Sequence, residues 1–176
     1  ANVVDAVCFD YGQRHAAREL EAAKRIASTA RVQLTIYLVD DGVGDWRPSG
    51  GSLVSAGGDL FGSDVVVPGR NRALLAAAAL TPRNEGFPDA LVFGACADDQ
   101  AVFEDCRPEF FRSVEAELRI PVHTPIIDKT KKQVVSLAKT LGATNLIMMS
   151  WSCYAGGDTP CGECGACLAR ARGLRS

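Results

Sequence analysis

Four cysteines near the end of the chain have the spacing of a metal site. They follow the pattern C-x7-C-x2-C-x2-C and are Cys153, Cys161, Cys164 and Cys167. Thiolates two residues apart on a turn can point at one ion, and the small residues between the last three permit a tight turn. The pattern favours a structural zinc ion with a closed shell of four thiolates. An iron–sulfur cluster and disulfides are the alternatives; the wide first gap and the absence of a Cys-Pro pair disfavour the cluster.

Two further polar clusters offer groups for catalysis and for anion binding. The first is the run DYGQRH, which supplies Asp10, Tyr11, Gln13, Arg14 and His15. It combines an acceptor, an amide, a fixed cation and a titratable imidazole, although a capped and solvated helix start would use the same residue types. The second is PGRN, where Gly69 permits close backbone approach while Arg70 and Asn71 open a helix. Helix N–H groups and a guanidinium suit phosphate or carboxylate; the alternative is a plain turn.

An acidic cluster forms a third candidate site. Its carboxylates surround Cys106 and precede Arg107; they are Asp98, Asp99, Glu104 and Asp105. Four carboxylates this close in sequence are compatible with a magnesium site for a nucleotide enzyme, and equally with a solvated acidic loop. The lone His123, in an extended stretch, is interpreted as structural.

Strands and helices are expected to alternate around these clusters. Apolar or β-branched runs predict strands at 3–9, 32–39, 64–67, 90–94 and 145–149. Between the first two strands, helical spacing is shown by Leu20, Ala23, Ala27 and Ala30. A capping box at 130–133 predicts a helix ending before Gly142, with one apolar face of Val134, Leu137, Ala138 and Leu141. Residues 40–62 are expected to form a long loop over a ligand, and 168–172 a short basic helix.

This order predicts a parallel α/β sheet, which binds ligands beyond the carboxyl ends of its strands. The polar clusters follow such ends. We expect residues 1–150 to form an α/β nucleotide-binding domain and residues 151–176 a zinc-binding module.

The composition describes an ordinary soluble protein. The 176 residues are 47% hydrophobic and 23% charged, with a net charge of −2. This gives no reason to expect a nucleic-acid track or a membrane surface as partner, and no apolar run is long enough to span a bilayer. The scattered Cys8, Cys96 and Cys106 suit a reducing compartment, so we expect a cytoplasmic protein.

Taken together, the motifs resemble one enzyme family. FDYGQRH, VPGRN, DCRPEF, the TP…TK stretch from Thr124 to Lys131, and SCY…PCGECGAC occur in the order found in the 7-cyano-7-deazaguanine synthase family of the queuosine pathway. The resemblance covers residues 9–170. It implies a Rossmann-like parallel sheet of the PP-loop (adenine nucleotide alpha hydrolase-like) type with a four-cysteine zinc site. It also implies a homodimeric, ATP-dependent carbon–nitrogen ligase, which converts 7-carboxy-7-deazaguanine and ammonia to the nitrile through adenylated and amide intermediates.

The resemblance assigns roles to the polar clusters. Arg14 and Arg70 are expected to stabilise phosphates with Mg²⁺, Asn71 to donate a hydrogen bond, and His15 to act as a base for ammonia. Residues expected to bind substrate or nucleotide are Asp10, Tyr11, Gln13, Gly69, Asn71, Asp99, Asp105, Arg107 and Lys131.

Two departures from the family pattern leave alternatives open. The SGGxDS loop that binds ATP phosphates is absent, since SGGS at 49–52 lacks Asp-Ser and follows the wrong strand. We therefore expect a fragment without its first few dozen residues, inactive alone. The loop reading CADDQAVFEDCR, where the family pattern is NAEDYSGYPDCR, admits a paralogue acting on another acceptor in defence or nucleic-acid modification. A non-catalytic zinc-stabilised scaffold, which would contact a partner or tRNA through Arg170, Arg172 and Arg175, and a tRNA thiolation enzyme, whose cysteines must stay reactive, are further alternatives.

Overall fold

The computed structural model describes residues 4–39, 43, 45–55, 58–82 and 86–175. The predicted first strand begins at Val3, which lies outside these residues, as do positions 40–42, 44, 56 and 57 of the predicted loop. Among the described residues, no helix combines the length and apolar character that crossing a membrane requires.

The strands form two small parallel sheets. In one, β1 (Asp5–Asp10) pairs in parallel with β2 (Gln33–Leu38), with Asp5 opposite Gln33. In the other, β3 (Leu91–Val92) pairs in parallel with β4 (Val122–His123). The α/β class with parallel pairing is confirmed, although each sheet has two strands within the described residues.

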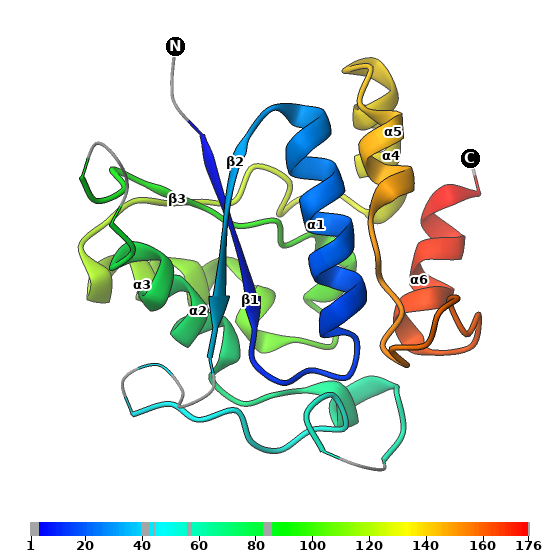
Figure 1. Cartoon of the computed structure of the whole chain (residues 1–176), viewed down its shortest axis with the longest axis horizontal. Coiled ribbons are helices and arrows are strands. Elements are labelled where there is room, and N and C mark those ends of the chain that lie inside the picture. Colours follow the sequence, from blue (N-terminus) through cyan, green and yellow to red (C-terminus); the bar gives the residue numbers. More distant parts are fainter. Residues whose placement is uncertain (1–3, 40–42, 44, 56–57, 83–85, 176) are drawn as a thin grey trace.

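Helix α1 (Ala16–Ala30) connects β1 to β2 and packs against both strands (Figure 1). Its buried residues are Ala22 and Ala27, whereas the predicted core position Ala30 is exposed. The helix ends at Arg31, which adopts a left-handed conformation with φ 55°. The prediction that this segment is helical is correct. The predicted apolar face is only partly correct, because Ala27 is buried and Ala30 is not.

Two predicted strands are wrong. Residues 64–67 overlap a 3₁₀ helix, η1 (Gly62–Val65), and pair with no strand. The carbonyl of Asp64 instead accepts hydrogen bonds from the backbone N–H and the hydroxyl of Ser52, so the loop uses an acceptor that a ladder would need. The apolar run at 145–149 forms helix α5 (Thr144–Met149), which packs on α1. The predicted strand at 90–94 is reduced to β3.

The main core lies around β3 and β4. Helices α2 (Arg70–Ala79) and α3 (Pro108–Leu118) cover this sheet, and the sequence patterns did not identify α3. The buried residues of this main core are Leu75, Leu91, Ala95, Cys106, Phe111, Val114 and Val122. A second cluster joins the predicted loop to the ends of β1 and β2 and contains Tyr11, Val39, Leu53, Val65 and Val67. Figure 1 shows this loop beyond the arrowheads of both strands.

Helices α4 (Lys131–Thr140) and α6 (Gly165–Leu174) pack against each other. The capping box is confirmed, because the Thr130 side chain accepts from the Gln133 N–H while the Gln133 side chain accepts from the Thr130 N–H. Val135 and Ala138 are buried, but the predicted core position Leu141 is 70% exposed because α4 ends one residue before it.

Helix α6 is also attached to α5. The Arg170 guanidinium donates to the Ser150 hydroxyl at 2.6 Å and to the Ile147 carbonyl at 3.0 Å. The C-terminal segment is therefore anchored to the helices beside α1.

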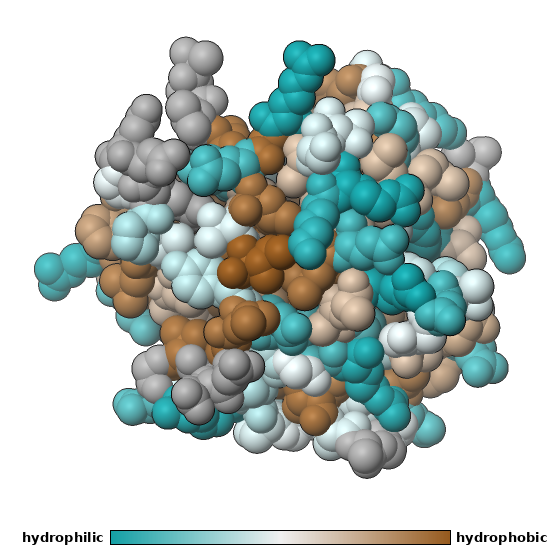
Figure 2. All heavy atoms as spheres, viewed as in Figure 1, coloured by the Kyte–Doolittle hydropathy of each residue, from teal (hydrophilic) through white to brown (hydrophobic). Residues whose placement is uncertain are grey.

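The visible surface is mixed, with hydrophobic side chains gathered over β1 and β2 (Figure 2).

Candidate active site and metal centre

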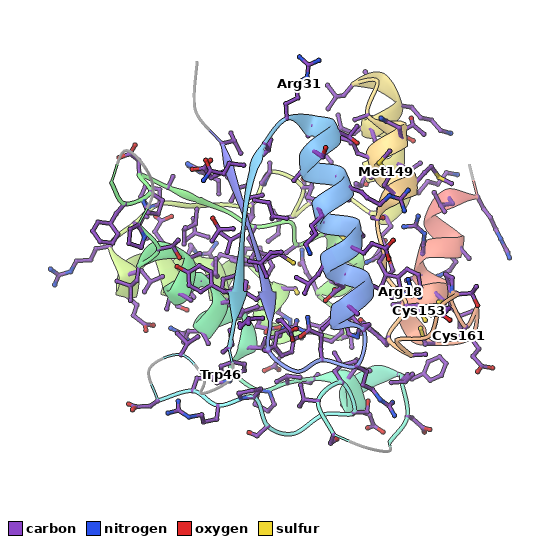
Figure 3. The ribbon with its side chains drawn as sticks, in the orientation of Figure 1. Arg18, Arg31, Trp46, Met149, Cys153 and Cys161 are labelled. Carbon is purple, nitrogen blue, oxygen red and sulfur yellow. The ribbon has the colours of Figure 1, made fainter. Side chains whose placement is uncertain are left out.

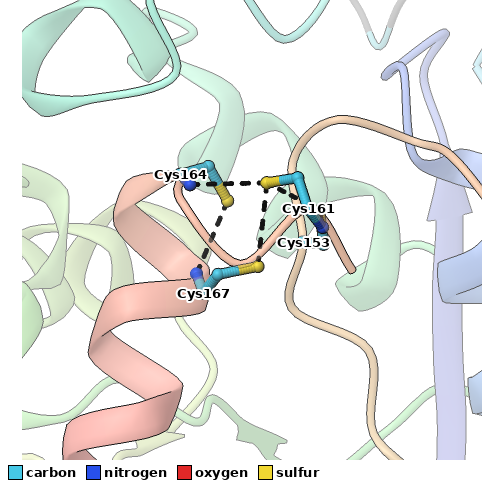
Figure 4. Close-up of side chains that lie close together, drawn as sticks. All are labelled: Cys153, Cys161, Cys164 and Cys167. Carbon is cyan, nitrogen blue, oxygen red and sulfur yellow. Dashed lines mark hydrogen bonds between the residues drawn. The ribbon is translucent and has the colours of Figure 1, made fainter. Parts of the chain in front are cut away.

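The four predicted zinc ligands converge. The sulfur atoms of Cys153, Cys161, Cys164 and Cys167 all lie within 4.8 Å of one another (Figure 4). Cys161 Sγ is 3.6 Å from Cys153 Sγ and 4.0 Å from Cys167 Sγ. Four thiolates at about 2.3 Å from one zinc ion would be about 3.8 Å apart, whereas disulfide sulfurs are about 2.05 Å apart. The separations fit a tetrahedral metal site, and all four cysteines are free of disulfides.

Backbone N–H groups already point at these sulfurs. Cys153 Sγ accepts from the N–H groups of Ala155 and Cys161, at 3.4 and 3.3 Å. Cys161 Sγ accepts from the Cys164 N–H and Cys164 Sγ from the Cys167 N–H, the latter at the start of α6. Such donors stabilise thiolates: those from Cys164 and Glu163 lower the pKa of Cys161 to about 7. The donor set suits a cation, and four sulfurs would leave no position for water or substrate.

The loop that carries the cysteines packs on the start of α1. Arg18 pairs with Asp158 of this loop, and Figure 3 shows Arg18 beside Cys153 and Cys161. Gly156 has φ 75°, and a Cβ built there would lie 2.1 Å from the Arg14 carbonyl oxygen. The close approach brings the next polar cluster against the metal centre.

Most of the DYGQRH residues hold the turn between β1 and α1. Asp10 accepts from the Gly12 N–H at 3.0 Å, and the Gln13 side chain bonds to Phe9, Tyr11 and Glu19. These bonds match the structural alternative for both residues. The side chain of Arg14 is exposed, and Arg14 lines neither of the cavities described below.

His15 lies behind this turn and is only 4% exposed. Its Nε2 is 3.5 Å from a Glu19 oxygen, while its buried Nδ1 has no partner at hydrogen-bonding geometry. Burial lowers the pKa of His15 more than Glu19 and the backbone of Tyr154 raise it, so the imidazole is neutral near pH 7. The ring packs on Tyr154 with centroids 5.6 Å apart and lines neither cavity.

Arg70 is a mostly buried cation without a carboxylate partner among the described residues. Its Nε donates to Asn71 Oδ1 at 3.1 Å and its Nη1 to the Tyr11 hydroxyl at 3.3 Å. Three of the five guanidinium N–H groups have no partner in these hydrogen bonds, so they can donate to a bound anion. Asn71 in turn donates to the Asp105 carbonyl, and Gly69 caps the helix at φ 73° against Trp46. The PGRN cluster therefore orients one guanidinium.

The acidic residues disperse instead of forming one magnesium site. Asp98 accepts from the Lys131 backbone N–H at 2.6 Å, and Asp99 pairs with the Lys131 ammonium and accepts from Cys96. Glu104 pairs with Arg107 at 3.6 Å, and Arg107 also donates to the Gln100 carbonyl. Within the described chain, the cysteines are the group of three or more residues placed to hold a metal ion.

Burial and neighbouring charges change the pKa of Lys131 and of Asp105. Burial would lower the pKa of Lys131, but the hydrogen bond and charge of Asp99 outweigh it and raise that pKa, so Lys131 is cationic. Burial raises the pKa of Asp105, and the charge of Arg70 opposes this rise. Asp99 of the acidic loop thus holds Lys131, at the start of α4, as a paired cation.

Two cavities lie between these groups. The inner one, of about 210 Å³, is lined by Arg70, Asn71 and Cys106 among others. The outer one, of about 900 Å³, lies between α4, α6 and η1, and its lining includes Asp98 and Lys131. The residues that line both cavities are Val65, Gly94, Asp99, Phe103 and Tyr154. Asp10, Tyr11, Gln13, Gly69, Asp105 and Arg107 line neither.

Tyr154 is not among the residues predicted to bind substrate, although the sequence predicts that the metal site fastens it beside the carboxyl edge of the sheet. The signal is that it directly follows Cys153. Of the three C-terminal arginines of the scaffold alternative, Arg170 is engaged inside the protein by α5.

Comparisons with known proteins agree on one family. The family model described as "Queuosine biosynthesis protein QueC" matches residues 1–176. The 7-cyano-7-deazaguanine synthase of Chromobacterium violaceum is 35% identical, over 99% of this chain and 78% of the relative. Those of Synechococcus elongatus and Thermoplasma acidophilum are 36% and 32% identical, covering 96% and 97% of this chain and 78% and 76% of the relatives. No solved structure matches the chain.

Proposed function

Because this chain belongs to the family of queuosine biosynthesis protein QueC, we propose that it acts as a 7-cyano-7-deazaguanine synthase. The proposed reaction consumes 7-carboxy-7-deazaguanine, ammonia and ATP and yields the nitrile, AMP and pyrophosphate. Support comes from the family match over all 176 residues and from relatives of this name in bacteria and archaea.

The chemistry proceeds through activation of oxygen as a leaving group. A carboxylate oxygen attacks the α-phosphate of ATP and pyrophosphate departs, which leaves an acyl adenylate. Ammonia then displaces AMP and loses a proton, giving the amide. The amide oxygen attacks the α-phosphate of a further ATP and displaces pyrophosphate, and departure of AMP with loss of both amide N–H protons gives the nitrile. Each of the two carboxylate oxygens thus leaves in an AMP, and no oxidant or reductant is required.

The observation that carries this proposal is the unpaired guanidinium of Arg70 beside the inner cavity. A cation with spare N–H donors in a partly desolvated site stabilises the carboxylate and the negative charge that develops during adenylation. Asn71 and the Tyr11 hydroxyl fix the orientation of the guanidinium, and Lys131 supplies a second cation. Mg²⁺ would arrive with ATP and neutralise its phosphates.

The four cysteines would hold zinc in a structural role. A closed shell of thiolates binds no substrate, so the ion would fasten the C-terminal segment beside the site. The proposal also includes a homodimer and a cytoplasmic location; sizing chromatography of the zinc-loaded protein tests the former.

The test is turnover by the complete gene product, loaded with zinc. ATP, Mg²⁺, ammonium and 7-carboxy-7-deazaguanine should release pyrophosphate, and mass spectrometry should detect the nitrile. Arg70→Lys should lower kcat/KM about 10²-fold, as for removal of a preorganised donor. Arg25→Lys, on the exposed face of α1, is the matched control and should retain full activity. Pyrophosphate release that ignores the deazapurine would contradict the proposed substrate.

A further inference from the structure

Tyr154 occupies the boundary between the two cavities and belongs to the metal-binding segment. It is among the residues that line both the inner and the outer cavity, and it directly follows the ligand Cys153. The other polar residue shared by the cavities is Asp99, which is already paired with Lys131.

The Tyr154 ring is held by a residue that lines neither cavity. The His15 ring packs on it at 5.6 Å with an interplanar angle of 50°. The backbone on either side of Tyr154 is fixed, because the Trp151 indole donates to the Cys153 carbonyl and the Ala155 N–H donates to Cys153 Sγ. Gly156 then contacts the backbone of Arg14. The ring is thus positioned before any ligand binds.

The hydroxyl of Tyr154 is uncommitted. None of the described residues forms a hydrogen bond with it, and the side chain is half-buried. A tyrosine hydroxyl can donate one hydrogen bond and accept others, so this one is available to a ligand. Arg70, with three spare N–H groups, and Asn71 line the same inner cavity. The cavity therefore offers an aromatic face, a hydroxyl and a guanidinium together.

The size of the inner cavity selects among the substrates. Its volume is about 210 Å³, against about 900 Å³ for the outer cavity. A bicyclic heterocycle suits the smaller space, and the larger one offers the room that a nucleoside triphosphate needs. A planar deazapurine acid matches the lining, because its carboxylate suits Arg70 while its ring suits contact with Tyr154.

We propose that Tyr154 is a substrate-contacting residue that seats the carboxylate-bearing deazapurine in the inner cavity, its hydroxyl hydrogen-bonding to the heterocycle. The inference rests on the proposed function. It makes the metal centre part of the substrate site, since the four cysteines place the residue that contacts the base.

The experiment compares Tyr154→Phe with wild type in the complete, zinc-loaded gene product. The KM for 7-carboxy-7-deazaguanine should rise about 5- to 30-fold, as expected when a buried hydrogen bond is lost. The KM for ATP, the zinc content and the Tm should stay at wild-type values. Tyr37→Phe is the matched control, because Tyr37 stacks on Phe9 within β1 and β2 and lines neither cavity. It should change neither KM.

The outcomes separate this inference from the proposed function. If the wild type is active and Tyr154→Phe keeps the KM for the acid within twofold, the proposed contact between Tyr154 and the substrate is wrong, while the proposed function stands. A rise confined to the KM for ATP overturns it as well, since the nucleotide would then occupy this site. If the wild type makes no nitrile, both the proposed function and the proposed substrate contact of Tyr154 are wrong. If Tyr154→Phe loses zinc, Arg70→Lys provides the second test, and it too must raise the KM for the acid but not for ATP.

Discussion

Replacing Gly156 by alanine should destabilise the protein well beyond the usual cost of such a change. Gly156 has a left-handed backbone, which costs a residue with a Cβ about 1 kcal/mol. The new Cβ would also lie 2.1 Å from the Arg14 carbonyl oxygen and 2.8 Å from its carbon. Both are backbone atoms that cannot swing aside, so the loop or the turn must shift, at a further cost of about 1–3 kcal/mol. The expected total is about 2–4 kcal/mol.

Gly142→Ala is the matched control, because Gly142 has a similar φ of 68° and nothing within 4 Å of its Cβ position. In zinc-saturated protein, differential scanning calorimetry should show a Tm lower by about 2–4 °C for Gly142→Ala and by about 4–16 °C for Gly156→Ala, at about 2–4 °C per kcal/mol. Gly156→Ala should also weaken turnover, since the shift displaces the loop that carries Tyr154. Equal losses of Tm in the two variants would refute the close approach between this loop and Arg14.

Three further predictions concern the metal, a buried histidine and a helix start. Cys161→Ser should lower the zinc content from about one ion per chain and should lower the Tm, whereas the control Cys8→Ser, on β1, should retain the ion. Inductively coupled plasma mass spectrometry measures the zinc content, and a full zinc content in Cys161→Ser would refute the site. Because burial lowers the pKa of His15 from 6.5, the unfolded chain binds a proton there that the folded chain excludes. The stability it contributes is present above about pH 6.5 and lost as pH falls toward the folded pKa, so urea unfolding of His15→Gln should lose less stability than wild type between pH 7.5 and 5.5; parallel curves would contradict this. Thr130→Ala should cost about 1 kcal/mol in urea unfolding by removing the capping box of α4, and Thr140→Ala, at the exposed last turn, should cost less.

The predictable parts of the fold are those encoded by short-range patterns. The capping box at Thr130 and the cysteine spacing each depend on a few neighbouring residues, and both are confirmed as geometry. The strand prediction at 145–149 is wrong because its four consecutive apolar residues, 146–149, suit a buried strand or a short helix equally, and contact with α1 decides.

The candidate site shows the same division. The sequence indicates that Arg70 lies at a helix start, whereas its lack of a carboxylate partner among the described residues is a tertiary property. The sequence does not indicate the dispersal of the acidic cluster, because Asp98 and Asp99 bind Lys131, which is more than thirty residues away along the chain. Tyr154 enters the site through packing between the metal-binding loop and α1, a tertiary contact that its adjacency to Cys153 indicates only in part.

The unequal burial of the four thiols has a consequence for metal exchange. Cys153 and Cys164 are 1% exposed and Cys167 is 8% exposed, whereas Cys161 is exposed to solvent. A chelator, a competing metal ion or a peroxide can reach Cys161 without unfolding of the chain, whereas the other three thiols are shielded from solvent. Loss of a bound ion would therefore begin by detachment of this one ligand, and its rate would depend on the redox history of the protein before its thermal stability changed.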